Sequence, residues 1–280
     1  MIDANDFDLV KTSDAPRLPP PARRPSSLLW LVVVALAVAT AAAFYLVANR
    51  KSRPVPVSQA EAARAAQVKP LGGAAASIDV PPLDQSDPVV RELVRQLTSH
   101  PRIAAWLATD GLIRTFTVAI ENVAGGSTPA ARFRVWRPPS GFEVVPRGRD
   151  LQIAPRSFER YDDLADAAAS IDAAGAARLY ATLKPRIEEA HRDLGYPDTP
   201  VDRTLERAIV SLLRTPVPTG AERLETKGIG YGYVDPALEG LTPAQKQLLR
   251  MGPRNVRMIQ SALRQIAIAL GIPPERLPLT

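Results

Sequence analysis

The sequence predicts an α+β protein, predominantly α-helical with a small antiparallel β-hairpin or sheet, preceded by one transmembrane helix. Three observations lead to this prediction. An uncharged apolar run extends from Leu28 to Ala48, and amphipathic segments with helical spacing fill most of the chain after Asp84. Two extended segments, near residues 141–154 and 223–236, interrupt those helices.

The run Leu28–Ala48 would be about 31 Å long as a helix, close to the roughly 30 Å hydrocarbon core of a bilayer. Trp30 and Tyr45 lie near its two ends, where such rings prefer the membrane interface. We therefore expect an uncleaved anchor that follows a disordered, Pro-rich tail over residues 1–27. A cleaved signal peptide is the alternative, because Ala39–Ala43 fits a small-residue cleavage pattern.

The basic residues that flank this anchor do not decide its orientation, because equal numbers lie on each side. They are Lys11, Arg17, Arg23 and Arg24 before it, and Arg50, Lys51, Arg53 and Arg64 after it. Since a short N-terminal tail more often stays inside, we expect a cytoplasmic N-terminus and an exported C-terminal domain.

Residues 49–83 have the composition of a flexible linker, rich in Pro, Ala and Gly and poor in large apolar side chains. About half of the net charge of +6 lies in this linker. The globular domain, expected over residues 84–280, holds 26 basic and 23 acidic residues. Such a small excess argues against a nucleic-acid-binding surface.

The segments of the domain follow from local signals. Ser86-Asp87-Pro88 is a helix start in which a Ser/Asp cap precedes proline, and GFEVV and LQIA, separated by PRGRD, predict a β-hairpin. RLETKGIGYGYVDP, residues 223–236, is expected to be extended. Helices are expected over residues 86–100, 101–111, 112–126, 157–172, 173–195 and 203–215, and two more begin near Thr242 and Pro253.

Composition removes several kinds of chemistry. The chain has no cysteine, which excludes disulfides, thiolate metal sites and a cysteine nucleophile. Glu188 and His191 match half of a di-iron carboxylate motif, but the second half is missing, since Leu97 stands where His100 would need a glutamate. We expect His191 to be an exposed helix residue. No catalytic, cofactor-binding or metal-binding residue is predicted, and no cofactor.

Three glycines alternate in GIGYGYVD, at Gly228, Gly230 and Gly232, but this is not a dinucleotide-binding pattern. In a strand they would leave one face bare, which favours close packing of a helix or another backbone over a ligand groove.

An acidic patch is expected on the helix over residues 157–172. A solvated face, an acid–base or cation site, and contact with the basic C-terminal helix are the three alternatives. Its residues are Glu159, Asp162, Asp163, Asp166 and Asp172, of which the first four would share one broad face.

The stretch LLRMGPRNVRMIQSALRQI, Leu248–Ile266, has the outline of a helix–turn–helix with a basic face. Gly252 and Pro253 end one helix and begin the next. The apolar stripe of the second helix consists of Val256, Ile259, Leu263, Ile266 and Leu270, and Arg254, Arg257 and Arg264 fall opposite it. This pattern predicts a structural corner with a basic, outward face. Its candidate interaction residues are Lys246, Arg250, Arg254, Arg257 and Arg264.

Three features together resemble the bacterial family called domain of unknown function 3014 (DUF3014), single-pass membrane proteins with a soluble C-terminal domain. They are LKPRIEEAHRDLGYPD, YGYVDPALEGLTPAQKQLLRMGPRN, and the anchor with its linker. The resemblance covers roughly residues 80–271, and QKQLLRMGP is its most specific part. It implies an anchored protein of the bacterial envelope and supplies no activity, substrate, cofactor or catalytic residues.

We therefore expect a membrane-anchored envelope protein with a non-catalytic binding domain in the periplasm. Its partners would be the bilayer, through the anchor, and an envelope protein or an acidic polymer, with no nucleic acid. A cell-wall or lipid-acting enzyme is the alternative, with carboxylates drawn from Asp162, Asp163, Asp166 and Glu188. A cytosolic nucleic-acid binder with the reverse topology is the third hypothesis.

Overall fold

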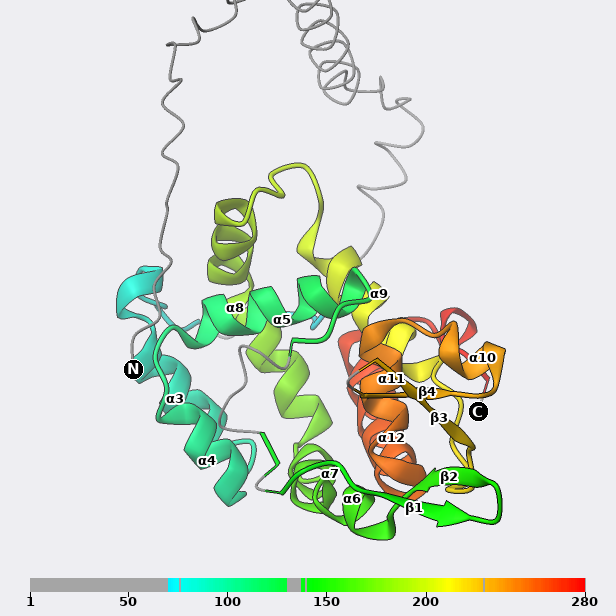
Figure 1. Ribbon diagram of the computed structural model, residues 1–280. Coiled ribbons are helices and arrows are strands. Elements are labelled where there is room, and N and C mark those ends of the chain that lie inside the picture. The colour runs from blue at the N-terminus through cyan, green and yellow to red at the C-terminus, as the bar shows by residue number, and fades with distance from the viewer. Residues whose placement is uncertain (1–69, 76, 130–136, 139, 229, 280) are drawn as a thin grey trace, which may run out of the picture. The chain divides into compact units, whose positions relative to one another are not determined.

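The computed structural model describes residues 70–279 except residues 76, 130–136, 139 and 229 (Figure 1). The helices are α3 (Asp87–Arg95), α4 (Pro101–Leu107), α5 (Leu112–Ala124), α6 (Pro155–Glu159), α7 (Asp162–Ala169), α8 (Ala173–Asp193), α9 (Val201–Leu213), α10 (Pro236–Glu239), α11 (Pro243–Leu249) and α12 (Gly252–Leu270). Short 3-10 turns lie at Leu83–Gln85 (η1) and Pro274–Arg276 (η3). The strands are β1 (Val144–Arg147), β2 (Asp150–Ile153), β3 (Leu224–Lys227) and β4 (Gly230–Tyr233). The predicted helix-rich α+β fold is confirmed.

The main core lies where α5, α8, α9 and α12 pack together. On α12, Val256 and Leu270 of the expected stripe are fully buried, and Leu263 and Ile266 are partly buried against the core. The other buried positions on this helix are small or polar and include Ala267. The buried side of α12 is therefore wider than the predicted apolar stripe.

The sheet consists of two consecutive antiparallel hairpins in the order β1-β2-β3-β4. The first hairpin is the predicted one, and Gly148 turns it with a φ of 64°. The expected extended segment 223–236 is itself a hairpin, and Gly228, with a φ of 59°, lies in its turn. The prediction of three glycines along one strand was therefore wrong for Gly228, because a tight turn needs a residue that tolerates positive φ.

The two outer strands expose different backbone groups. The Val234 amide donates to the Arg223 carbonyl, so by alternation the backbone groups of Tyr231 and Tyr233 face the free edge of β4. On β1, the Ala154 amide donates to the Glu143 carbonyl, which turns Pro146 toward the free edge. Proline has no amide hydrogen to leave unpaired there.

Two local expectations about helix ends were wrong. The helix expected over residues 157–172 is divided into α6 and α7 at Arg160 and Tyr161, so Glu159 does not share a helix with the aspartates of α7. Ser86 does not cap α3 with its side chain, because its hydroxyl donates to the Leu83 carbonyl.

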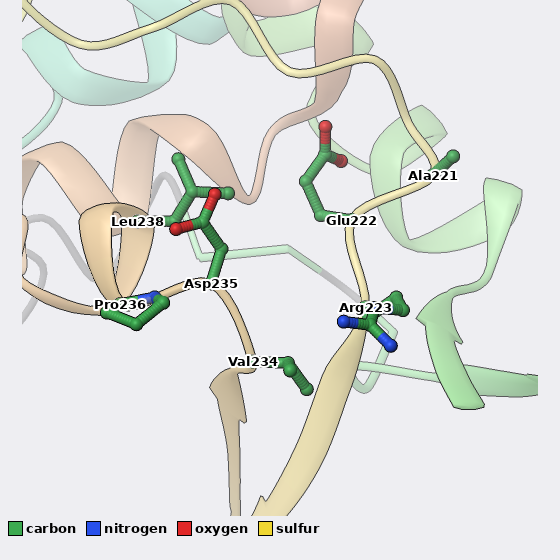
Figure 2. Close-up of a pocket in the computed structure, with 7 residues that line it drawn as sticks. All are labelled: Ala221, Glu222, Arg223, Val234, Asp235, Pro236 and Leu238. Atoms are coloured by element: carbon green, nitrogen blue, oxygen red, sulfur yellow. The ribbon is translucent and has the colours of Figure 1, made fainter. Parts of the chain in front are cut away.

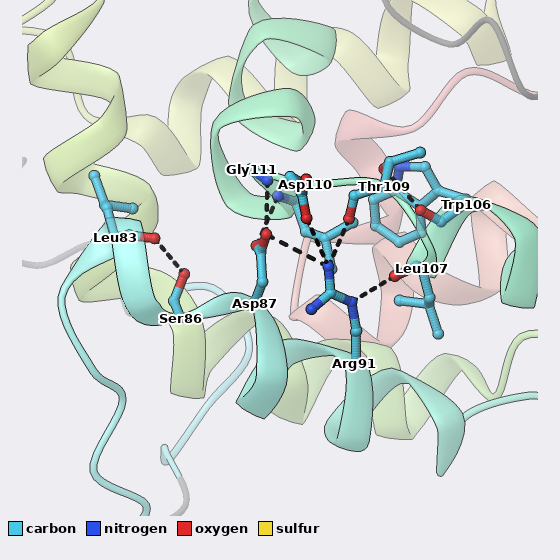
Figure 3. A network of polar contacts seen from close by, with 10 residues as sticks. Leu83, Ser86, Asp87, Arg91, Trp106, Leu107, Thr109, Asp110 and Gly111 are labelled. Carbon is cyan, nitrogen blue, oxygen red and sulfur yellow. Dashed lines mark hydrogen bonds and ion pairs between the residues drawn. The ribbon is translucent and has the colours of Figure 1, made fainter.

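The carboxylate of Asp87 caps a different helix from the one it begins. It accepts hydrogen bonds from the amides of Gly111 and Leu112, 2.7 and 3.0 Å away, at the start of α5 (Figure 3). Arg91 lies beside it and donates to the carbonyls of Leu107 and Thr109 at the end of α4 (Figure 3). One turn of α3 therefore fixes the corner between α4 and α5.

The described residues between 70 and 80, which we name the strap, lie on the core before the expected boundary at Asp84. Leu71 and Val80 are buried, and the Gly72 amide donates to the Leu270 carbonyl. Arg186 of α8 donates two hydrogen bonds to the Val80 carbonyl, at 3.1 and 2.9 Å. The packed part of the chain therefore includes the last third of the predicted linker.

The predicted anchor Leu28–Ala48, the tail before it and linker residues 49–69 lie outside the described residues. Within the described part of the chain, no single helix is long and apolar enough to cross a bilayer. The pair α4 and α5 passes that test only when taken together, and the two helices are bent by 111°.

The strap gives a matched pair of glycine substitutions. Gly72 and Gly73 both have positive φ, but a Cβ atom on Gly72 would lie 2.6 Å from the Ala177 carbonyl oxygen, whereas one on Gly73 would meet nothing within 4 Å. Gly73→Ala should cost only backbone strain, about 1 kcal/mol. Gly72→Ala should cost about 1–3 kcal/mol more because it overpacks the contact with α8. Denaturant unfolding followed by circular dichroism measures both, and equal losses would contradict the strap's close packing.

Candidate functional site

Most of the predicted basic face is bonded within the domain, beginning with the two residues on or beside α11. Lys246 Nζ donates to the Glu239 carbonyl at 3.0 Å, and Arg250 donates to the Tyr231 carbonyl at 2.9 Å. That carbonyl faces the free edge of β4, so the Arg250 side chain covers a backbone acceptor of the sheet.

Glu239 of α10 covers the other end of the same edge. Its carboxylate accepts from Lys227 Nζ at 2.7 Å and from the Tyr233 amide at 3.1 Å, and Lys246 Nζ lies 3.3 Å away. Lys227, the Tyr233 amide and Lys246 together lower the pKa of Glu239 to about 2. A Cβ atom on Gly232 would lie 3.0 Å from Lys227 Cδ, so the bare face of this strand residue admits the ion pair.

Arg254 of α12 joins the basic helix to the acidic helix. Its guanidinium lies 2.8 Å from Asp166 and 3.5 Å from Asp162, both on α7. Beside it, the buried Asn255 amide donates to Asp162 at 2.8 Å and to the Phe158 carbonyl at 3.0 Å. Of the three alternatives for the acidic patch, contact with the basic C-terminal helix is the one observed for these two aspartates.

The remaining predicted site residues differ from one another. Arg264 donates to the Pro278 carbonyl and holds the C-terminal segment, whereas Arg257 is exposed. Asp163 of α7 pairs with Arg102 of α4 at 3.3 Å. Asp172, which follows α7, caps α8 by accepting hydrogen bonds from the amides of Ala174 and Gly175. The structure therefore uses most of these charges to join elements of the fold.

A hollow of about 450 Å³ lies at the open end of the second hairpin (Figure 2). Glu222 and Asp235 contribute its carboxylates, and Arg223 and Leu238 are among its other lining residues. Glu222 accepts hydrogen bonds from Thr219 and Gly220, and Asp235 accepts from the Ala237 amide, so both acids stabilise local turns. The aspartates of α7 do not line this hollow, although the enzyme hypothesis places a cleft near the glycine strand.

His191 is buried, with 2% of its surface exposed, so the prediction of an exposed helix histidine was wrong. Its Nε2 atom lies 2.5 Å from Glu121 Oε1 of α5, and its ring stacks on Tyr196 with centroids 5.4 Å apart. In the sequence, the neighbour of His191 on the same helical face is Glu188, three residues before it on α8. The bonding partner of His191, Glu121, lies 70 residues away in the chain.

A second hollow, of about 200 Å³, opens above His191 at the turn between α8 and α9; we name it the turn hollow. Its lining includes Glu188, His191, Tyr196 and Asp198. Tyr196 and Leu194, two residues before it in the chain, are 44% and 42% exposed and are among the exposed large apolar side chains of the domain. The turn hollow therefore combines a buried imidazole, two carboxylates and an exposed aromatic ring. Among the described residues, no group of three metal-ligating side chains is close enough to hold a metal ion.

Residues 112–267 match the family described as protein of unknown function (DUF3014). The chain belongs to this family. The match confirms the resemblance drawn from the sequence, and it extends from the first residue of α5 to Ala267 of α12, so the turn hollow and the sheet lie inside the family domain. No curated protein and no solved structure matches the chain significantly.

Within the family domain, the structure exposes a basic surface that we did not single out from the sequence. Arg203, Arg207 and Arg214 are exposed on or directly after α9, and at 100° per residue they fall within about 40° of one another. The spacing of four and seven residues was available in the sequence. The net balance of charge concealed it, because α9 also carries two acids, Asp202 and Glu206.

The contacts of Glu239 predict a specific pH dependence. Because folding lowers its pKa from the usual 4.5 to about 2, its stabilisation is complete above pH 4.5 and is lost as the pH falls toward 2. The difference in unfolding free energy between wild type and Glu239→Gln should therefore be constant above about pH 5 and shrink below it. Urea unfolding across this pH range measures the difference.

The control measures the same difference in unfolding free energy between Lys227→Gln and the double variant Lys227→Gln/Glu239→Gln. Lys227 is the largest cause of the lowered pKa of Glu239. Without it that pKa should lie closer to 4.5, so the stability difference should change over a narrower range of pH. A difference that stays constant from pH 5 to pH 2 would contradict this account of Glu239.

Proposed function

We propose that this chain is a single-pass protein of the bacterial inner membrane, with its N-terminus in the cytoplasm and a non-catalytic binding domain in the periplasm. The apolar run Leu28–Ala48 supports the anchor by its length and lack of charge. The strap supports the tethered arrangement, because it fixes the N-terminal end of the domain to α8, α9 and α12.

The observation that carries the binding role is the turn hollow. Exposed Tyr196 and buried His191, which is bonded to Glu121 of α5, line this small hollow, and exposed Leu194 lies between them in the chain. Exposed aromatic rings next to a small pocket are typical of the few residues that dominate a protein interface. A volume of about 200 Å³ suits one side chain of a partner. We infer that an envelope protein inserts a side chain there.

A second candidate is an enzyme that acts on the cell wall or on lipid. It is favoured by one observation, the presence of Glu188 and Asp198 around His191 in the same hollow, since carboxylate and imidazole groups are the usual acid–base residues. Asp162, Asp163 and Asp166, the other carboxylates of this hypothesis, are bonded to Arg254 and Arg102 instead.

Two measurements separate these functions from the cytosolic alternative. A reporter that is active only in the periplasm, fused after Thr280, should be active, and a silent reporter would overturn the proposed topology. Purified chain mixed with isolated cell wall should release no soluble fragments. Release that Glu188→Gln abolishes would favour the enzyme.

Tyr196→Ala should weaken partner binding without weakening the fold. A photoreactive residue at Leu194 should crosslink the partner in cells, and Tyr196→Ala should raise its dissociation constant by about 2 kcal/mol, or roughly thirtyfold. Ile268→Ala is the matched control, since it removes another exposed apolar side chain, 54% exposed, from α12. If both variants bind equally well, the turn hollow is not the binding site.

A further inference from the structure

The arginine stripe, Arg203, Arg207 and Arg214, lies opposite the buried side of α9. The buried side is formed by Val201, Leu205 and Ala208 among others, and at 100° per residue its centre is about 150° from the stripe. At 1.5 Å per residue the stripe extends over about 16 Å. It is therefore a straight row of cations that points away from the core.

The acids near the stripe are committed to other partners. Asp202 turns inward and accepts from Tyr180 Oη and Lys184 Nζ, each at 2.6 Å. Glu206 pairs with Arg276 at 3.2 Å. Among the described residues, the side chains of Arg203 and Arg214 form no hydrogen bond or ion pair, and Arg207 donates only to the Thr204 hydroxyl. The stripe differs in this respect from the arginines of α12, most of which are bonded within the domain.

The point where the linker joins the domain lies at the first turn of α9. The Leu71 amide donates to Asp202 Oδ2 at 3.2 Å, so the described chain begins next to the stripe. Linker residues 50–69 carry Arg50, Lys51, Arg53, Arg64 and Lys69 against the single acid Glu61. As a flexible chain, a linker of this length has a root-mean-square span of about 25 Å.

That span is shorter than the diameter of the domain, which is about 44 Å for a compact sphere with the expected radius of gyration of about 17 Å. If the linker starts at the membrane, the part of the domain at its other end is held close to the bilayer surface. The part in question is the N-terminal end of α9, with the arginine stripe beside it. Both the linker and the stripe are cationic, and anionic headgroups attract such segments within about a Debye length.

We propose that the arginine stripe of α9 lies on the anionic headgroups of the membrane in which the chain is anchored. This inference rests on the proposed anchor. The contact orients the domain, because it places α9 toward the bilayer. In Figure 1, α6 and the first hairpin lie at the opposite end of the domain from α9, so they would point away from the membrane.

The absence of cysteine from the sequence allows the contact to be measured with a single label on the full chain. The probe is a fluorophore at Ser211→Cys, between Arg207 and Arg214. The chain is reconstituted in nanodiscs that contain a headgroup-quencher lipid in phosphatidylcholine, with or without phosphatidylglycerol. A second label at Ser140→Cys, whose carbonyl accepts from Arg160 beyond the end of α6, reports on the far end.

The expected result is quenching at Ser211→Cys that requires phosphatidylglycerol and is reversed by salt, with no such change at Ser140→Cys. The triple variant R203Q/R207Q/R214Q should lose the lipid-dependent quenching, and R203K/R207K/R214K should keep it. The matched control R147Q/R149Q/R156Q removes three exposed arginines from the first hairpin and α6, and it should also keep it. Thermal unfolding checks that every variant is folded.

Equal quenching with and without phosphatidylglycerol, or full quenching in R203Q/R207Q/R214Q, would overturn the inference. Soluble polyglutamate that binds through the stripe when phosphatidylglycerol does not would also overturn it, in favour of an acidic polymer. Retention of the chain in membranes after alkaline extraction is a separate measurement that tests the anchor alone. A chain that is extracted contradicts the proposed anchor, whereas a retained chain with an unquenched label contradicts only the role of the stripe.

Discussion

The carboxylate of Asp202 joins three parts of the chain that are distant in sequence. It accepts a hydrogen bond from Tyr180 and from Lys184 on α8, and from the amide of Leu71 in the strap, while it belongs to the first turn of α9. A partly buried carboxylate needs hydrogen-bond donors in place of water, and here the donors come from the elements that it joins. The end of the strap and the rotation of α9 about its axis both depend on this cluster.

The fold class was predictable because helical spacing, Gly and Pro signals and hairpin turns are local properties. The corner at Gly252 and Pro253 and the first hairpin follow from them directly. The division between α6 and α7, and the capping of α5 by Asp87, depend on contacts between elements. Local patterns do not contain that information, and they suggested Asp87 as a cap of α3 although its carboxylate caps α5.

The candidate sites were less predictable for a related reason. A charge in a sequence has a sign and a helical position, but its partner is set by the fold. Arg254 was correctly placed on a basic face, yet that face meets the aspartates of α7. His191 was expected to be exposed because its partner Glu121 lies on another helix, 70 residues away in the chain. Three exposed arginines that form no ion pair among the described residues lie on α9 or directly after it, where no motif drew attention to them.

The sheet has two free edges, and some of the backbone groups along each are already bonded or missing. Along β4, the Tyr233 amide is bonded to Glu239 and the Tyr231 carbonyl to Arg250, while Pro146 on β1 has no amide hydrogen to offer. Exposed strand edges are templates on which copies of a protein can add strands and aggregate. Two copies of this domain would meet with fewer free edge groups, because Glu239, Arg250 and Pro146 occupy or remove three of them.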